Sequence, residues 1–128
     1  MAAAAELATH LPPEVTIALH GDLGVGKTVF VKGLARGWGI TDTVTSPTFN
    51  LFSIYLGERQ LLHLDAYRLE SPEAVEDLLI EEFLRPPYCL AVEWPEKTGD
   101  WLPPDAWHFE LSLTSGGAHL IQLLSKSG

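Results

Sequence analysis

A short, almost continuous apolar run followed at once by glycines dominates the first third of the chain. Residues 15–20 (VTIALH) include β-branched side chains, and such a run is typical of a central strand buried on both faces. Residues 21–28 (GDLGVGKT) follow, and from Lys27 apolar residues recur largely at helical spacing until Gly37 and Gly39, which are helix-stop signals. The pattern predicts a strand, a glycine loop and a helix in direct succession.

Paired apolar runs farther along the chain predict two hairpins. Residues 49–56 and 60–65 form the first pair, residues 106–113 and 118–124 form the second, and turn-forming residues separate the two runs of each pair. Residues 88–94 (YCLAVEW) predict one more buried strand. Because hairpin strands are antiparallel and strands joined through a helix are parallel, we expect a mixed sheet.

Further helix and turn signals complete the pattern. Residues 71–84 (SPEAVEDLLIEEFL) begin with Ser71 as the expected N-cap, a proline at the first helical position and acidic residues in the first turn. The Ala-rich residues 1–11 predict the last turns of a short helix, and the prolines of residues 95–104 predict a turn. With no internal repeat or linker, residues 1–128 are expected to form a single α/β domain.

Composition narrows the classes of function. The chain has 128 residues, 46% of them apolar and 20% charged, as expected for a soluble globular domain. Its 8 basic and 17 acidic residues give a net charge of -9, which repels nucleic acid and anionic membranes at long range. No signal peptide or 18-residue apolar run is found. The one cysteine, Cys89, lies in an apolar run, so we expect it to be an inert core thiol. We expect a cytoplasmic protein with no membrane partner that leaves RNA to other chains.

The glycine-rich residues match the pattern GxxxxGK[ST] through Gly21, Gly26, Lys27 and Thr28. Glycines let the backbone curl closely around a triphosphate, so that its N–H groups and those of the helix N-terminus hold phosphate oxygens. Lys27 would reach the β- and γ-phosphates, and the Thr28 hydroxyl would bind Mg²⁺. A dinucleotide-binding loop is excluded because Val29 stands where its third glycine belongs. A GTPase is disfavoured because the sequence lacks the NKxD pattern that reads guanine.

Two carboxylates end predicted strands, where a phosphate site needs them. Asp65 ends LLHLD, with His63 two residues earlier on the same strand face, and Glu93 ends CLAVE. One would hold Mg²⁺ and the other would orient an attacking water, in either assignment, although each is also an ordinary polar strand terminus. Ser46 and Thr48, in SPT, have two equally good interpretations. They could belong to a switch loop that senses the γ-phosphate, or they could cap a turn.

The segments GDLGVGKT, SPTF, HLDAYR and VEWPE occur in the order and with the spacing of the TsaE family, which the chain resembles from about residue 5 to about residue 113. That family comprises bacterial P-loop ATPases needed for the synthesis of N6-threonylcarbamoyladenosine (t6A) on tRNA. The resemblance implies a P-loop NTPase fold of the α/β class. Its mixed central sheet would have a parallel core, flanking antiparallel strands and helices on both faces.

The resemblance also implies ATP and Mg²⁺ as ligands and gives roles to individual residues. The catalytic residues would be Asp65, Glu93 and Lys27, and the Mg²⁺ ligands would be Thr28 and Glu93. Nucleotide binding would involve the loop, a switch-like segment and one aromatic residue, namely Leu23, Gly24, Val25, Gly26, Lys27, Thr28, Ser46, Thr48 and Trp94.

The implied partners are TsaB and TsaD, with TsaC in the same pathway and tRNA met only through the complex. ATP hydrolysis would let that complex turn over. Two alternatives are kept: a P-loop small-molecule kinase, for which the chain has only four arginines, and a non-catalytic nucleotide-dependent binding module. The sequence departs from the family at Leu79, where members often have a glycine, and family members usually begin with a longer N-terminal helix.

Overall fold

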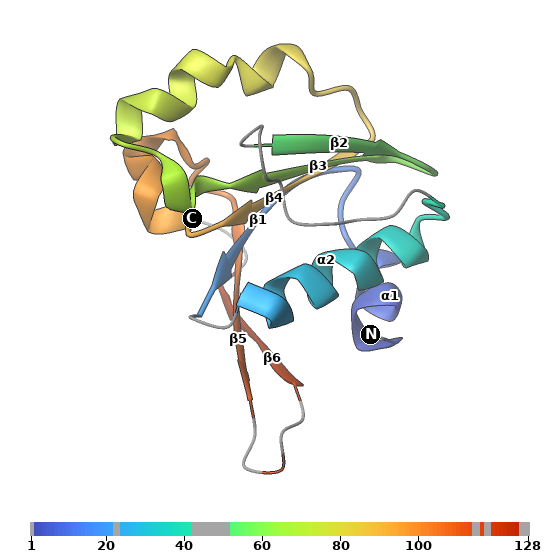
Figure 1. Ribbon diagram of the computed structural model, residues 1–128. Helices are drawn as coiled ribbons and strands as arrows, with labels where there is room; N and C mark the ends of the chain where they lie inside the picture. Colours follow the sequence, from blue (N-terminus) through green and yellow to red (C-terminus); the bar gives the residue numbers. More distant parts are fainter. Residues whose placement is uncertain (1, 22–23, 42–51, 114–115, 117–118, 126–128) are drawn as a thin grey trace.

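The computed structural model describes residues 2–21, 24–41, 52–113, 116 and 119–125. In these residues the strands form one six-stranded sheet of order β2-β3-β4-β1-β5-β6 (Figure 1). The neighbours β3, β4, β1 and β5 run parallel, and the edge strands β2 and β6 are antiparallel to their neighbours. The predicted mixed sheet with a parallel core is therefore confirmed. The strands are β1 Glu14–His20, β2 Phe52–Leu56, β3 Gln60–Asp65, β4 Tyr88–Glu93, β5 Trp107–Leu113 and β6 His119–Ser125.

Helical segments cover both faces of this sheet, as predicted (Figure 1). On β4, Cys89 and Ala91 belong to the core under the α-helices, whereas Leu90 and Val92 belong to the core under the 3-10 helices. This alternation follows from the two-residue period of a strand, and it explains why the run is apolar throughout. The segments are α1 Ala2–Ala8 and α2 Gly24–Gly37 on one face, and η1 Ala66–Arg68, η2 Pro72–Leu78, η3 Ile80–Glu82 and η4 Pro95–Trp101 on the other.

The segment 71–84 differs from its prediction. It forms two 3-10 stretches instead of one helix, because Leu79 between them adopts a left-handed conformation with φ 53° and ψ 40°. Ser71 has the extended backbone of an N-cap, but its side chain makes no capping hydrogen bond. The expected turn after Pro95 is also helical, since residues 95–101 form η4.

The first glycine of the loop is required by its surroundings. Gly21 follows β1 directly with φ 116°, a conformation that residues with a side chain rarely adopt. A β-carbon at this position would also collide with the carbonyl oxygen of Leu111 on β5. The chain then enters α2 at Gly24, three residues earlier than the predicted start at Lys27.

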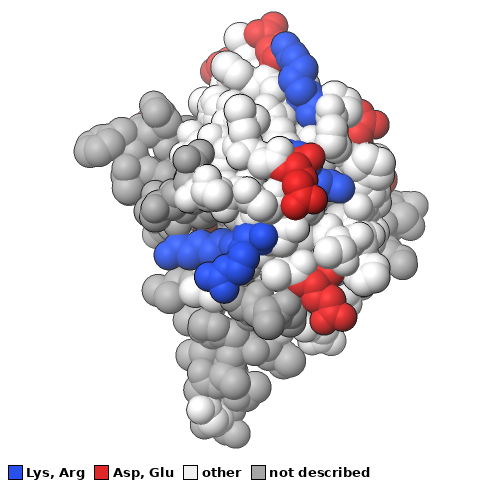
Figure 2. Space-filling view, turned by 90° about the vertical axis from the view of Figure 1, so that its right-hand side faces the viewer, with Lys and Arg blue, Asp and Glu red and all other residues white. Residues whose placement is uncertain are grey.

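Charge is dispersed on the face shown in Figure 2, where basic and acidic side chains are scattered over a largely uncharged surface. The overall charge of -9 is therefore not concentrated on this face. In the described part of the chain, no helix combines the length and apolar character needed to cross a membrane.

Candidate functional site

The carboxyl ends of three parallel strands bring polar residues to one edge of the sheet. In the strand register, Glu93 at the end of β4 lies between Leu19 of β1 and Asp65 of β3. His20 ends β1 one residue later, and α2 begins four residues after it. In open α/β sheets ligands bind at this edge, beyond the carboxyl ends of the strands. The fold thus brings the glycine loop and both predicted carboxylates to the same place.

Lys27 lies in the first turn of α2, and its side chain is fully buried. Its Nζ atom lies 3.9 Å from the centre of the Trp94 ring, close enough for a cation–π interaction. Trp94 is half-buried, has φ 57°, and packs against Tyr67 with ring centres 5.1 Å apart. The ammonium group and the N-terminal amides of α2 together make this region electropositive, which suits an anion.

Glu93 is held by a neighbour that the sequence did not identify as its partner. The Glu93 Oε2 atom lies 2.5 Å from Nε2 of His63, and the two residues are 3% and 0% exposed. In the register, His63 is opposite Ala91, two residues before Glu93, so the pair is a diagonal contact between parallel strands. Buried charges are stabilised by such partners. Only the strand register, which a single sequence does not give, reveals this pair.

Asp65 has a different environment from Glu93. It is half-buried at the end of β3, and its Oδ1 atom accepts a hydrogen bond of 3.0 Å from the backbone N–H of Tyr67, capping η1. One oxygen of Asp65 therefore has a local structural role. Sequence alone could not separate the two carboxylates, whereas in the fold Glu93 is the buried one.

A histidine pair also lies at this edge. His20 Nε2 and His108 Nδ1 are 2.9 Å apart, and the two rings stack with centres 5.1 Å apart. Burial lowers the pKa of His20, and the positive charge of His108 and that of Lys27 lower it further, against the raising effect of Glu96 and Glu110.

Thr28 and Glu93 form the donor set that was predicted for Mg²⁺. Among the described residues, no group of three or more histidine, cysteine, aspartate or glutamate side chains is placed to hold a metal ion. Magnesium commonly binds proteins through one or two carboxylates and completes its shell with water and substrate phosphates. A hydroxyl and a carboxylate would therefore suit Mg²⁺ that is held jointly with a triphosphate and water, and they are too few for an all-protein metal cage.

The remaining predicted residues are only partly described. Gly24, Val25 and Gly26 form the first turn of α2 with Lys27. Leu23, Ser46 and Thr48 lie outside the described residues. Cys89 is fully buried, so the prediction of a core thiol is confirmed, and burial raises its pKa to about 12.

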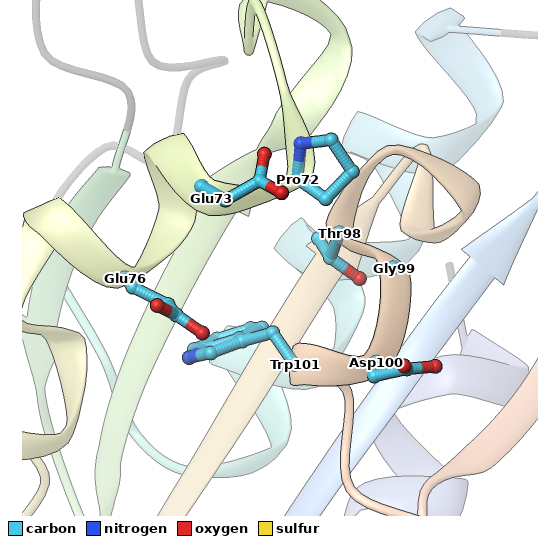
Figure 3. A pocket seen from close by; sticks show the side chains of 7 residues that line it. All are labelled: Pro72, Glu73, Glu76, Thr98, Gly99, Asp100 and Trp101. Atoms are coloured by element: carbon cyan, nitrogen blue, oxygen red, sulfur yellow. The ribbon is translucent and has the colours of Figure 1, made fainter.

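A cavity of about 390 Å³ lies elsewhere, between η2 and η4 (Figure 3). Its walls include the carboxylates Glu73, Glu76 and Asp100 and the ring of Trp101. Three carboxylates would repel a phosphate group at close range. None of the predicted site residues lines this cavity, so it is separate from the candidate site at the edge of the sheet.

Comparisons with known proteins agree on one family. The family model described as "Threonylcarbamoyl adenosine biosynthesis protein TsaE" matches residues 1–119. Proteins named "tRNA threonylcarbamoyladenosine biosynthesis protein TsaE" are 44% identical over 87 residues in Treponema pallidum and 47% identical over 97 residues in Synechocystis sp.. These matches cover 68% and 72% of this chain, but only 64% and 61% of the relatives. The chain therefore spans less than two thirds of the length of these relatives.

A solved structure shows the same arrangement. The crystal structure of YdiB from Bacillus subtilis matches with a TM-score of 0.75 at 32% sequence identity. The match covers 98% of this chain and 78% of the YdiB chain. This similarity confirms that the six-stranded sheet and its helices form an α/β fold of the predicted P-loop type.

Proposed function

Because the chain belongs to the TsaE family, we propose that it binds and hydrolyses ATP with Mg²⁺ to support t6A synthesis on tRNA. In this proposal the chain acts with TsaB and TsaD, and ATP hydrolysis lets their complex turn over. TsaC acts in the same pathway. The net charge of -9 favours contact with tRNA only through these partners, in the cytoplasm.

The observation that carries the proposal is the buried Lys27 ammonium at the N-terminus of α2, on the edge of the sheet where Glu93 ends β4. An ammonium group and helix N-terminal amides together favour the β- and γ-phosphates of a nucleotide. The Trp94 ring, which lies against the same ammonium, would border the nucleotide.

The other proposed residues act on the metal and the water. The Thr28 hydroxyl and the Glu93 carboxylate would hold Mg²⁺, which supplies charge neutralisation at the terminal phosphates when it is bound. Asp65 is the second carboxylate at this edge, and we assign it the positioning of the attacking water or of a metal-bound water. Leu23, Ser46 and Thr48 keep their predicted roles in nucleotide binding.

The first prediction tests the loop with a matched pair of lysine variants. Lys27→Ala should weaken ATP binding by roughly 10- to 100-fold, because charge-assisted hydrogen bonds to the phosphates are lost. Lys32→Ala removes an exposed lysine from the same helix and should leave the affinity unchanged. Isothermal titration calorimetry measures both values, and undiminished ATP affinity in Lys27→Ala would contradict the assignment of the loop.

Reconstitution tests the biological role. ATP hydrolysis and multiple-turnover tRNA modification are measured with TsaB, TsaC and TsaD, with and without this chain. We expect slow hydrolysis by the chain alone, acceleration by the partners, and repeated turnover only when the chain is present. If modification is equally efficient without it, the proposed role is wrong. Transfer of the γ-phosphate to a small molecule would instead favour the kinase alternative, and binding without any accelerated hydrolysis would favour the binding module.

A further inference from the structure

His63 contacts Glu93, the carboxylate that we propose as a ligand of Mg²⁺. We infer that His63 is a positioning residue, which donates a hydrogen bond from Nε2 to Glu93 Oε2 and thereby fixes the carboxylate so that its other oxygen, Oε1, would be available to Mg²⁺. The inference rests on the proposed function, because Glu93 is a metal ligand only if the chain binds Mg²⁺ with a nucleotide. It assigns His63 a role that neither the glycine loop nor the carboxylates imply.

His63 and Glu93 stand on adjacent parallel strands, and both point to the α2 face of the sheet, which is shown by their alternation with Leu62, Leu64 and Val92 of the opposite core. The strand position directly opposite His63 is Ala91, whose small side chain leaves room for the imidazole to reach along the sheet. The contact therefore joins two rigid elements instead of a loop and a strand. A carboxylate oriented in this way loses little further freedom when it binds a metal.

The surroundings of the two ring nitrogens of His63 indicate which of them carries the hydrogen. An ionised carboxylate, the form that binds Mg²⁺, can only accept, so Nε2 is the donor when Glu93 acts as a metal ligand. The other ring nitrogen, Nδ1, is buried and has no hydrogen-bond partner in the described part of the chain. A hydrogen on Nδ1 would be a buried donor without an acceptor, which is costly, whereas a bare nitrogen there loses only an acceptor. The geometry therefore favours the tautomer with hydrogen on Nε2, which is the tautomer that can hold Glu93.

The two oxygens of the Glu93 carboxylate have different surroundings. Oε2 is occupied by the imidazole, and in the described residues no hydrogen bond or ion pair of the chain reaches Oε1. A metal ligand needs one free oxygen and a fixed orientation, and this pair provides both. Partners of this kind commonly change metal affinity or activity by about 10- to 100-fold when they are removed. Asp65, by contrast, has its Oδ1 atom bound to a backbone N–H.

Two amide variants separate hydrogen bonding from packing. In His63→Gln the side-chain nitrogen can occupy approximately the place of Nε2, whereas in His63→Asn the shorter side chain falls short of Glu93. Both variants keep a polar amide in the same buried position, so a merely structural role predicts similar effects. The probe is the Mg²⁺ concentration that gives half-maximal binding of adenylyl-imidodiphosphate, a non-hydrolysable ATP analogue, measured on the full chain by calorimetry.

We expect His63→Asn to raise that Mg²⁺ midpoint about tenfold, and His63→Gln to stay within about twofold of the wild type. Binding of the analogue in the absence of Mg²⁺ should be the same in all three proteins, because the loop is unchanged. Thermal unfolding followed by circular dichroism verifies that each variant is folded. Equal midpoints for the wild type and His63→Asn, or equal shifts in both variants, would overturn the inference.

A second measurement does not depend on nucleotide. Long-range ¹H–¹⁵N correlation spectra report the tautomer of each histidine, and comparison with His63→Gln assigns the His63 signals. We expect hydrogen on Nε2, and hydrogen on Nδ1 would overturn the inference. If the wild type binds no analogue with Mg²⁺ yet shows the Nε2–H tautomer, the His63–Glu93 contact stands and the proposed function fails. If the analogue binds and the tautomer is wrong, only the role of His63 fails.

Discussion

At the scale of single residues, Leu79 has a backbone conformation that is unfavourable for a residue with a β-carbon. Its φ of 53° lies in the left-handed region, where a β-carbon costs roughly 1–2 kcal/mol. The side chain is 52% exposed, so it recovers only part of that cost by burial. Glycine, which the resemblance to the family leads us to expect here, would adopt this left-handed conformation without strain.

Replacing this leucine should therefore stabilise the protein. Leu79→Gly removes the strain but adds chain entropy to the unfolded state worth about 0.5–1 kcal/mol, so we expect a net gain of about 0.5–1 kcal/mol in the free energy of unfolding. Urea denaturation measures the change. Leu79→Ala is the control, since it keeps a β-carbon and should give no gain. A loss of stability in Leu79→Gly would mean that the exposed leucine makes contacts of greater value than its strain.

The candidate site shows which residue-scale features a sequence can predict. The glycine pattern lies within a few residues of the sequence, so Gly21, Lys27 and Thr28 could be predicted as a phosphate-binding set without a fold. The environments of Glu93 and Asp65 depend on strand register and on a local cap, which sequence spacing does not contain. His63 was noted for its strand face, but its partner is 30 residues away and two positions along a neighbouring strand.

At the scale of elements, strands were easier to predict than the helical segments of the second face. The runs of β1 and β4 are apolar throughout because both faces of each strand are covered, and a short run of this kind is typical of a central strand. Residues 71–84 carried good helix-start signals, yet they fold as two 3-10 stretches separated by Leu79. Both stretches still bury one apolar residue each in the core, Val75 before Leu79 and Ile80 after it, so the apolar pattern predicted burial better than it predicted the type of helix.

The contact between α1 and α2 depends on one small residue. A β-carbon at Gly37 would lie 2.6 Å from the Ala5 carbonyl oxygen and 2.8 Å from the β-carbon of Ala8. The same helix pair is joined by a hydrogen bond of 3.0 Å from Trp38 Nε1 to the Ala8 carbonyl oxygen. Close approach of the two backbones is therefore a packing requirement of this face.

Gly37→Ala should separate the two helices. Although alanine is the better helix former by about 1 kcal/mol, overpacking typically costs about 1–3 kcal/mol, so we expect a net loss of stability. Guanidinium denaturation followed by tryptophan fluorescence suits the test, because Trp38 lies at the contact. The control, Arg36→Ala, changes an exposed position in the same turn and should stay within about 0.5 kcal/mol of the wild type. A more stable Gly37→Ala protein would show that α1 is not closely packed.

At the scale of the whole molecule, the sheet brings together histidines that are 88 residues apart in the chain, and so links stability to pH. The pKa of His20 is lowered, chiefly by burial and then by the charge of His108. As the pH falls through about 6.5, the pKa of histidine in the unfolded chain, His20 is protonated in the unfolded state but still neutral in the folded state. The unfolded state therefore binds more protons than the folded state in this pH range. Stability should therefore rise with pH across this window and fall on acidification.

The corresponding variant should flatten that dependence. In His20→Gln, the decrease in the free energy of unfolding between about pH 7.5 and about pH 5.5 should be smaller than in the wild type, because one group that gains a proton on unfolding is gone. The comparison uses the change with pH within each protein, since the variant also loses the contact with His108 at every pH. His10→Gln, at an exposed position, controls for removal of any histidine. If His20→Gln loses as much stability on acidification as the wild type does, the histidine pair does not set the response, and the acidic residues dominate it.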